Sequence, residues 1–144
     1  MIVPDANLFL YAYDGTSTHH APAVAWLEST FAGTELIGLP WQSIWAFLRI
    51  ATNGRIHANP VAMDRAIGIA QQWIDLKNVR LLVPGERHWS LLQIMLIEGR
   101  VNGRSVTDAA LAALTIEYGA VLHTADRGFA RFPGLRWINP LQQS

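Results

Sequence analysis

Residues 1–13 read MIVPDANLFLYAY, and they predict how the chain opens. The apolar residues Ile2 and Val3 indicate a very short strand, which gives way at Asp5 to an apolar helix from about Ala6. Open α/β sheets place their ligand chemistry where a strand ends and a helix begins. Asp5 therefore has two interpretations: it caps the helix by accepting from backbone N–H groups, or it is a functional carboxylate. The choice depends on whether other acidic residues reach the same place.

The composition is that of a globular chain. Its 144 residues fit one domain, 1–144, with 51% hydrophobic and 15% charged residues. The absence of cysteine excludes disulfides, thiolate catalysis and cysteine-based zinc sites. No apolar run is long enough to cross a membrane, and the N-terminus lacks the basic start of a signal peptide. We expect a cytoplasmic protein without membrane association.

The charge pattern is neutral overall but rich in arginine. The formal net charge is zero, so the field of the whole protein does not indicate nucleic-acid binding. Every basic residue except Lys77 is an arginine, and six of the arginines lie beyond residue 86. Arginine binds phosphate through two parallel hydrogen bonds, which favours a phosphate ligand. A GC-rich coding bias would produce the same excess.

Alternating strand and helix patterns predict an α/β fold with a parallel sheet. The expected strands are residues 2–3, 35–39, 79–83, 120–124 and, as a short fifth strand, 135–137. One helix is expected to begin at about residue 6. The other expected helices span residues 21–31, 41–51, 61–76, 86–98 and 108–118. Asn59 and Pro60 have the residue types of a helix start and are expected to open the 61–76 helix.

Three acids are expected to converge at one edge of this sheet. Asp5 follows the first strand and Asp126 the fourth, and Asp108 begins an alanine-rich helix just before that fourth strand. Three neighbouring carboxylates repel one another unless a cation lies between them, and hard oxygen ligands select Mg²⁺ or Mn²⁺. Such a site suits phosphodiester hydrolysis. The alternative is three independent helix caps, and the residues alone leave both interpretations open.

The acidic motifs resemble those of a known family. IVPDANLFLYAY around Asp5, VTDAALAAL around Asp108 and TADRGFARFPGLRWINPL around Asp126 resemble PIN domains, and more closely the VapC-type toxins of toxin–antitoxin pairs. LPWQSIWAFLRIATN and VPGERHWSLL also resemble one subgroup of those toxins. The likeness extends over essentially the whole chain, and the ordered combination is more specific than any single acid.

The resemblance implies a fold, an activity and partners. The expected fold is a three-layer α/β/α arrangement with a central parallel sheet of four or five strands. The expected activity is that of an Mg²⁺-dependent endoribonuclease toxin, with Mn²⁺ as a substitute. By resemblance, Asp5 and Asp108 are metal ligands and Asp126 is the third acid of the site. The family forms homodimers and is inhibited by a VapB-type antitoxin that inserts a segment into the site.

Two positions depart from the family pattern. The usual glutamate of the helix after the second strand is replaced by Ala46, and an aspartate that often follows the D-R pair is replaced by Gly128. Gln42, one turn before Ala46, could contact a metal-bound water or simply be a polar residue at a helix start. The alternative function is therefore a catalytically impaired PIN-fold protein that binds RNA or its antitoxin. A phospho-accepting receiver domain is disfavoured because Lys77 is the only lysine and lies at the end of a helix.

Further residues have weaker candidate roles, and each has a structural alternative. Asn7 and Thr124 could orient Asp5 and Asp126 through hydrogen bonds, or act as simple caps. Possible contacts to RNA phosphates come from three arginines that alternatively are solvated surface residues: Arg49, Arg104 and Arg127. Possible base-stacking residues, for which an interface or core position is the alternative, are Trp41, Trp45 and Trp89. The apolar helices that carry Trp73 and Trp89 favour a homodimer.

Overall fold

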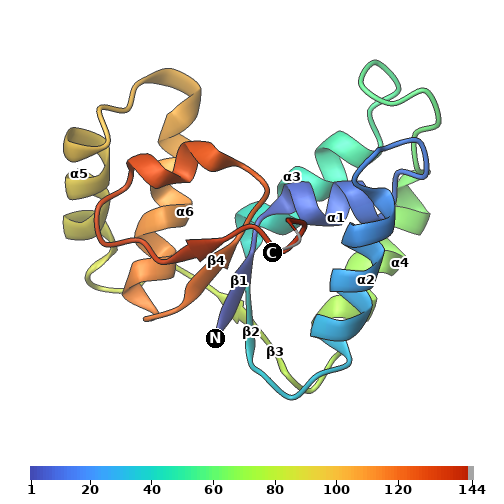
Figure 1. The fold of residues 1–144 in the computed structure, drawn as a ribbon, viewed down its shortest axis with the longest axis horizontal. Coiled ribbons are helices and arrows are strands. Elements are labelled where there is room, and N and C mark those ends of the chain that lie inside the picture. The colour runs from blue at the N-terminus through green and yellow to red at the C-terminus, as the bar shows by residue number, and fades with distance from the viewer. Residues whose placement is uncertain (143–144) are drawn as a thin grey trace.

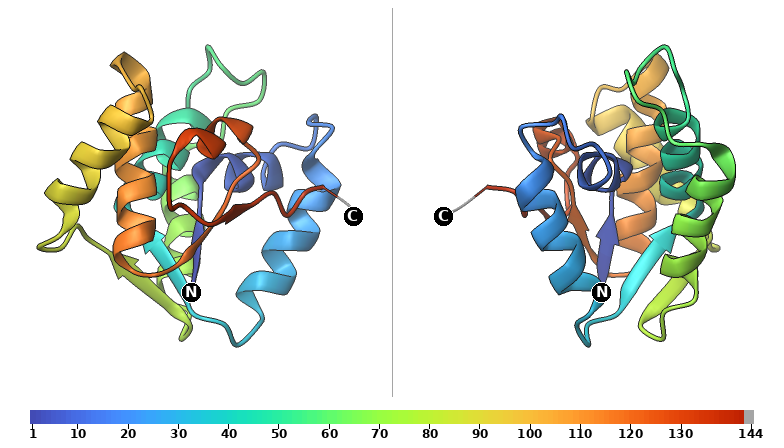
Figure 2. Two further views of the ribbon diagram at one scale, coloured as in Figure 1. Left: turned by 60° about the vertical axis from the view of Figure 1, so that its left-hand side comes forward. Right: turned by 90° about the vertical axis from the view of Figure 1, so that its right-hand side faces the viewer.

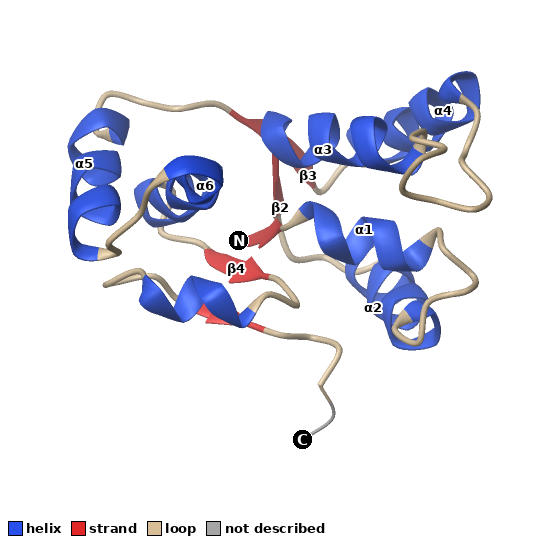
Figure 3. Cartoon of the chain, turned by 90° about the horizontal axis from the view of Figure 1, so that it is seen from above, coloured by secondary structure: helices blue, strands red, loops and turns tan. Residues whose placement is uncertain are grey.

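A computed structural model describes residues 1–142, which form a five-stranded parallel sheet between two layers of helices (Figure 1, Figure 3). The strand order is β3-β2-β1-β4-β5, so β1 lies at the centre. Figure 2 shows β1 and β2 running side by side toward the helices that follow them. This arrangement confirms the predicted three-layer α/β/α fold with a parallel sheet.

The elements follow the order expected from the sequence. The strands are β1 (Ile2–Pro4), β2 (Ile37–Pro40), β3 (Val79–Leu82), β4 (Val121–His123) and β5 (Trp137–Ile138). The α-helices are α1 (Ala6–Ala12), α2 (His20–Phe31), α3 (Trp41–Ala51), α4 (Met63–Ile74), α5 (His88–Glu98) and α6 (Val106–Glu117). Two 3₁₀ turns, η1 (Gly103–Ser105) and η2 (Arg127–Arg131), precede α6 and follow β4. Among the described residues, no helix is long and apolar enough to cross a membrane.

Two hydrophobic cores lie on opposite faces of the sheet. The first is built mainly by α1 to α4 and is dominated by aromatic rings: Phe9 stacks on Trp73 at 4.0 Å between ring centroids and contacts Phe47 edge-on. The second is formed by α5, α6 and η2, where small residues of α6 allow close packing. Figure 1 shows α5 and α6 on one side of the sheet and α1 to α4 on the other. Burial on both faces explains why the strands are almost entirely apolar.

The register of the central strands brings Asp5 beside the end of β4. Ile2 pairs with Val121 and Pro4 with His123, and the Asp5 N–H donates to the His123 carbonyl at 2.9 Å. The residue that follows His123 is Thr124. The strand pairing itself therefore places Asp5 next to Thr124, although the two residues are far apart in sequence.

The start of α4 differs from the prediction. Asn59 and Pro60 lie in a loop, and the helix begins at Met63 with Ala62 in an extended conformation. The Val61 N–H donates to the Ala51 carbonyl at the end of α3, at 2.8 Å. This contact holds the chain extended for two more residues, so the local helix-start signal is overridden by packing against α3.

The tryptophans divide between core and surface. Trp73 is only 4% exposed, because its ring completes the aromatic core on Phe9, so the Trp73 side chain itself contributes no dimer surface. By contrast Trp45 is 63% exposed and Trp89 65%, and Trp41 is also exposed. A core position for these three residues is therefore excluded.

Candidate active site

Asp5 is both a helix cap and a cavity-lining carboxylate. It precedes α1 in an extended conformation, and its Oδ1 accepts from the Ala6 N–H at 2.8 Å. Its Oδ2 accepts from the Thr124 hydroxyl at 2.7 Å. The side chain also lines a cavity of about 550 Å³ between α1, α3 and α6. The two interpretations offered by the sequence are thus compatible, because capping occupies one oxygen and leaves the other toward Thr124 and the cavity.

A small hydrogen-bond network fixes the orientation of the Asp5 carboxylate. The Thr124 Oγ1 accepts from the Asn7 side-chain amide at 3.2 Å and from the Asp126 N–H at 3.0 Å. With its acceptor positions used in this way, the Thr124 hydroxyl proton points to Asp5. Thr124 is fully buried, which keeps water from competing for these bonds. These bonds join the side chains of Asn7, Thr124 and Asp5 to the backbone of Asp126.

Asp108 reaches the same cavity from the first turn of α6. It lines the cavity together with Asp5, and the opposite wall is formed by α3 through Gln42, Ala46 and Arg49. Ala46 contributes only a methyl group to this wall. The cavity therefore has carboxylates on one side and no acid on the other.

Gln42 makes a contact that the sequence did not indicate. Its side-chain amide donates to the Thr107 carbonyl at 3.0 Å, bridging α3 to the residue before Asp108. The amide hydrogen that makes this bond is engaged with the protein backbone, while the side-chain oxygen remains an acceptor. Gln42 thus ties together the two helices whose residues face each other across the cavity.

Asp126 lies nearby but does not line the cavity. It caps η2, where its Oδ1 accepts from the Gly128 N–H at 2.8 Å, and the side chain is exposed. Its charge nevertheless acts on both other acids, raising the pKa of Asp5 and of Asp108. The three acids therefore form one electrostatic group, of which two members share the cavity.

The carboxyl of Asp5 is the most perturbed acid of this group. Burial is the main cause that raises its pKa to about 6 from the ordinary value of 3.8, and the hydrogen bonds from Thr124 and Ala6 counteract the rise. Burial also raises the pKa of Asp108, and Asp126 adds to the effect, whereas the nearby Arg131 lowers it. Ionised Asp5 is thus poorly compensated by the protein.

The arginines do not surround the acids as expected. Arg49 lines the acidic cavity, but Arg127 lines a different one beside Tyr11 and His19. Arg104 lies in η1 just before α6, where its carbonyl accepts from the Thr107 hydroxyl, and it is not among the residues that line the acidic cavity.

The sequence analysis did not find Arg131, whose guanidinium is held in place beside Asp108. Its Nε donates to the Gly99 carbonyl at 2.8 Å and its Nη2 to the Arg100 carbonyl at 2.9 Å, at the end of α5. Arg100 has a left-handed backbone with φ of 52°, unusual for a residue other than glycine. No sequence spacing relates Arg131 to Gly99 or Asp108, so only its position in the basic C-terminal third offered a signal.

The donor set fits a hard divalent cation. Asp5 and Asp108 present carboxylate oxygens to one cavity and Asp126 adds negative charge, and a cation would offset the burial and the mutual repulsion that together raise both pKa values. Within residues 1–142, however, no three acidic or histidine side chains are already arranged as a metal-binding cluster. The chemistry of the donors therefore suits Mg²⁺ or Mn²⁺, with two carboxylates as the core of the site.

Comparison with known proteins identifies close relatives. The family model of the PIN domain matches residues 2–135. Ribonuclease VapC33 of Mycobacterium tuberculosis is 40% identical over 143 residues, which cover 99% of this chain and 100% of that protein. Two solved structures have similar folds. FitAB bound to a DNA fragment matches with a TM-score of 0.72 at 15% identity, covering 100% of this chain and 98% of that one. VapBC-1 from nontypeable Haemophilus influenzae matches with a TM-score of 0.67 at 18% identity, covering 99% and 100%.

The raised pKa of Asp5 predicts a pH-dependent cost to the fold. An acid whose pKa is higher in the folded than in the unfolded state destabilises the fold above the folded pKa and not below the unfolded one. The shift from 3.8 to about 6 corresponds to at most about 3 kcal/mol. In EDTA, Asp5→Asn is expected to increase the free energy of unfolding at pH 8, and the gain should shrink between pH 6 and pH 4.

Urea unfolding of both proteins from pH 4 to pH 8 measures this difference. Asp64→Asn, at the exposed start of α4, is the matched control and should show no such trend. A stability difference between Asp5→Asn and the parent chain that stays constant with pH would contradict the assignment.

Proposed function

Because the chain belongs to the PIN-domain family and, within it, to the VapC ribonucleases, we propose that it cleaves RNA internally at the Asp5–Asp108 cavity with a divalent metal ion as cofactor. The observation that carries this proposal is the pair of partly buried carboxylates in one cavity. Asp5 has a raised pKa and its carboxylate lacks a cationic partner in the ion pairs of the described chain. Such a pair gains most from a bound cation.

The residues have distinct roles in this proposal. Asp5 and Asp108 would hold the metal ion, which when bound supplies a Lewis acid for phosphodiester hydrolysis. Asp126 adds negative charge at the rim. The Thr124 hydroxyl, itself held by Asn7, keeps one oxygen of Asp5 in a fixed direction and so preserves the carboxylate orientation that metal binding needs. Mg²⁺ is the proposed natural ion, and Mn²⁺ is expected to replace it.

RNA needs positive charge near this acidic cavity. Arg49 lines the cavity and Arg131 acts electrostatically on Asp108, so we assign these two residues to contacts with RNA phosphates. The guanidinium of Arg131 is already held by two carbonyl groups, which lowers the entropic cost of a contact. Arg104 lies on η1 and Arg127 on η2, and we give both residues positions on the path of the RNA outside the acidic cavity.

The proposed partners are a VapB-type antitoxin and a second copy of the chain. The antitoxin follows from the relationship to the VapC ribonucleases, since VapBC-1 has the same fold. The second copy is supported by the exposed apolar side chains of Trp45 on α3, Trp89 on α5 and Val83. Trp45 and Val83 line a largely apolar groove of about 300 Å³, which His88, the neighbour of Trp89, also lines. Exposed apolar surface of this kind is typical of a protein interface.

Removal of the carboxylate or of the metal ion should abolish cleavage. Asp5→Ala is expected to lower the rate of RNA cleavage by more than about 100-fold, because even loss of a group that only supports a metal ligand costs about 10–100-fold. EDTA should stop the parent chain, and added Mg²⁺ or Mn²⁺ should restore it. Gel analysis of a labelled structured RNA measures both effects.

Asp64→Ala is the control for this experiment, since it removes a carboxylate from the first turn of α4, an element that does not line the cavity. Its activity should remain that of the parent chain. Cleavage that survives both Asp5→Ala and chelation would rule out the proposed site.

Ala46 distinguishes a complete site from an impaired one. Ala46→Glu adds a carboxylate to the cavity wall that faces Asp5 and Asp108, so the Mg²⁺ concentration for half-maximal cleavage is expected to fall about tenfold. At saturating Mg²⁺ the maximal rate should not change. Ala46→Gln, which has similar size without charge, should leave the Mg²⁺ dependence unaltered. A large rise of the maximal rate in Ala46→Glu would instead support the second candidate function, an RNA- or antitoxin-binding protein with an impaired site.

Arg131 should affect RNA binding more than chemistry. Arg131→Gln is expected to raise KM for RNA several-fold with little change in kcat. The slope of log affinity against log salt concentration should also fall by about 1, the effect of losing one phosphate contact. Arg80→Gln is a matched control, because Arg80 also donates to two carbonyl groups but lies on β3. Thermal unfolding of both variants identifies any loss of folded protein. An unchanged KM and salt dependence in folded Arg131→Gln would remove Arg131 from the RNA path.

A further inference from the structure

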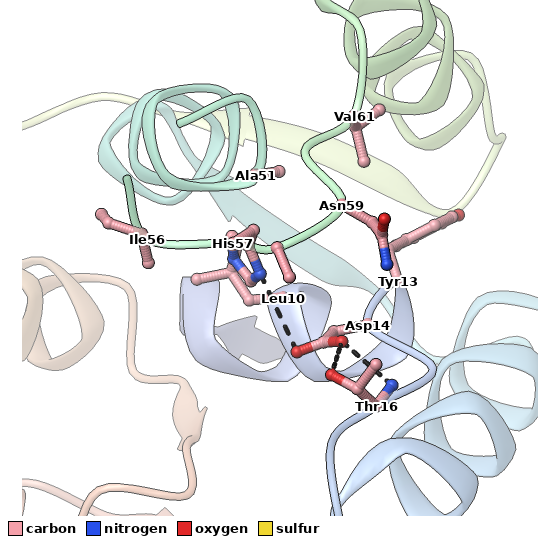
Figure 4. Close-up of a pocket in the computed structure, with 10 residues that line it drawn as sticks. Leu10, Tyr13, Asp14, Thr16, Ala51, Ile56, His57, Asn59 and Val61 are labelled. Carbon is pink, nitrogen blue, oxygen red and sulfur yellow. Dashed lines mark hydrogen bonds and ion pairs between the residues drawn. The ribbon is translucent and has the colours of Figure 1, made fainter. Parts of the chain in front are cut away.

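A second cavity lies at the far end of the helix that Asp5 caps. Its volume is about 280 Å³, and it is enclosed by the end of α1, the end of α3 and the loop of residues 53–62. Figure 4 shows Asp14 and His57 facing each other in it, with Asn59 near Tyr13. Leu10 and Ile56 give it apolar walls. None of these polar groups takes part in the metal site proposed above.

This cavity continues the acidic one along a single groove. Leu10 lines both cavities, Asn7 lies one turn before Leu10 on α1, and Asp14 follows the end of that helix. On α3, Ile50 lines the first cavity and Ala51 the second. The two helices lie side by side (Figures 1 and 3). Since α1 has 7 residues, the groove between the cavities is about 10 Å long.

The polar groups of the second cavity have unused hydrogen-bonding capacity. His57 is only 21% exposed, yet its Nδ1 is 3.8 Å from the Asp14 Oδ2, which is too long for a hydrogen bond. Its Nε2 is buried and has no hydrogen-bond partner in the described part of the chain. Buried polar atoms are nearly always paired, so this histidine calls for an explanation. The Nδ1 and the Asp14 Oδ2 face each other without a hydrogen bond, so a ligand that enters between them can bond to both.

Asp14 is held rigidly in front of His57. Its Oδ1 accepts from both the N–H and the hydroxyl of Thr16, at 3.0 and 2.6 Å. These two bonds fix the carboxylate and leave Oδ2 directed at His57. The cavity therefore offers a fixed acceptor, an imidazole and, at its rim, the Asn59 amide, between apolar walls. A flat heteroaromatic ring with a hydrogen-bonding edge matches this combination.

We propose that this second cavity is a nucleobase subsite, which takes an unpaired base of the same RNA strand that is cleaved in the first cavity. The inference rests on the proposed ribonuclease function. The Asp14 carboxylate accepts hydrogen bonds and cannot donate them. The exocyclic amino group of cytosine, adenine or guanine donates to it freely, whereas the only ring N–H of an unpaired uracil lies between two carbonyl oxygens that the carboxylate repels, so the amino-bearing bases are favoured over uracil. The subsite thereby sets which unpaired base stands at a fixed distance from the cleaved bond.

Binding of free nucleotides tests the subsite without any cleavage. The probes are the 5′-monophosphates of cytidine, adenosine, guanosine and uridine, titrated into the metal-free full-length chain and followed by saturation-transfer difference NMR. The three amino-bearing nucleotides are expected to bind about fivefold more tightly than UMP, the effect of about one hydrogen bond. Preference among bases is the readout, because a phosphate contact elsewhere would bind all four equally.

Two variants and a control make the test specific. Asp14→Asn retains an oxygen for Thr16 but presents an amide donor to the ligand, and all four bases carry acceptors, so the preference over UMP is expected to disappear. His57→Ala should weaken all four nucleotides. His88→Ala is the matched control, because His88 is also partly buried, has an unpaired Nδ1 and lies 4.0 Å from Glu117, outside this groove. Equal binding of the four nucleotides to the parent chain, no binding to it, or an unchanged preference in Asp14→Asn would overturn the proposal.

RNA cleavage separates this inference from the function on which it rests. On a pool of RNA with randomised loops, Asp14→Asn should cut at sites whose sequence differs from those cut by the parent chain. If the parent chain cuts RNA and Asp14→Asn keeps the same sites, the subsite is wrong and the ribonuclease function stands. If the parent chain cuts no RNA although its nucleotide preference depends on Asp14, the ribonuclease function is wrong and the base-binding cavity stands.

Discussion

The hydrogen bond from the Thr124 hydroxyl to the Asp5 carboxylate joins the two strand ends at which the candidate site is assembled. It is possible because β1 and β4 are parallel neighbours, so that their carboxyl ends lie at one edge of the sheet. The same threonine accepts from Asn7 and from the Asp126 backbone, so one buried hydroxyl coordinates the start of α1 and the start of η2. Any change that shifted β4 against β1 would therefore disturb the orientation of Asp5, and with it the cavity.

The acids of the site are costly to the fold and useful to the proposed function for the same reason. Burial of Asp5 removes water from its carboxylate, and Asp108 and Asp126 add repulsion, which together raise its pKa. Arg131 compensates Asp108 rather than Asp5. A divalent cation between the carboxylates would relieve this repulsion. The free energy of folding that the buried acids cost in the metal-free state would then contribute to the free energy of metal binding. The methyl group of Ala46 keeps that charge lower than a glutamate would.

The helices that follow the strands give the site its shape. Because α1 and α3 both begin at the carboxyl edge of the sheet and run side by side, one groove leads from the acidic cavity to the cavity at Asp14 and His57. Trp45 of α3 lines both the acidic cavity and the apolar groove beside Val83. In our proposals, RNA and a second copy of the chain therefore contact adjoining parts of α3.

The sequence alone determined the alternation of strands and helices, the three-layer architecture and the residues 41–51 of α3, because these follow from local apolar periodicity and helix signals. It also placed Asp5 and Asp126 at one edge, since parallel strands leave no other arrangement. Local patterns could not show that α4 begins at Met63, or that Asp126 turns to accept from the Gly128 N–H. Nor could they reveal the bond from Gln42 to Thr107 or the position of Arg131. Each of these depends on a contact between segments that only the packed tertiary structure brings together, or on a turn whose geometry that packing sets.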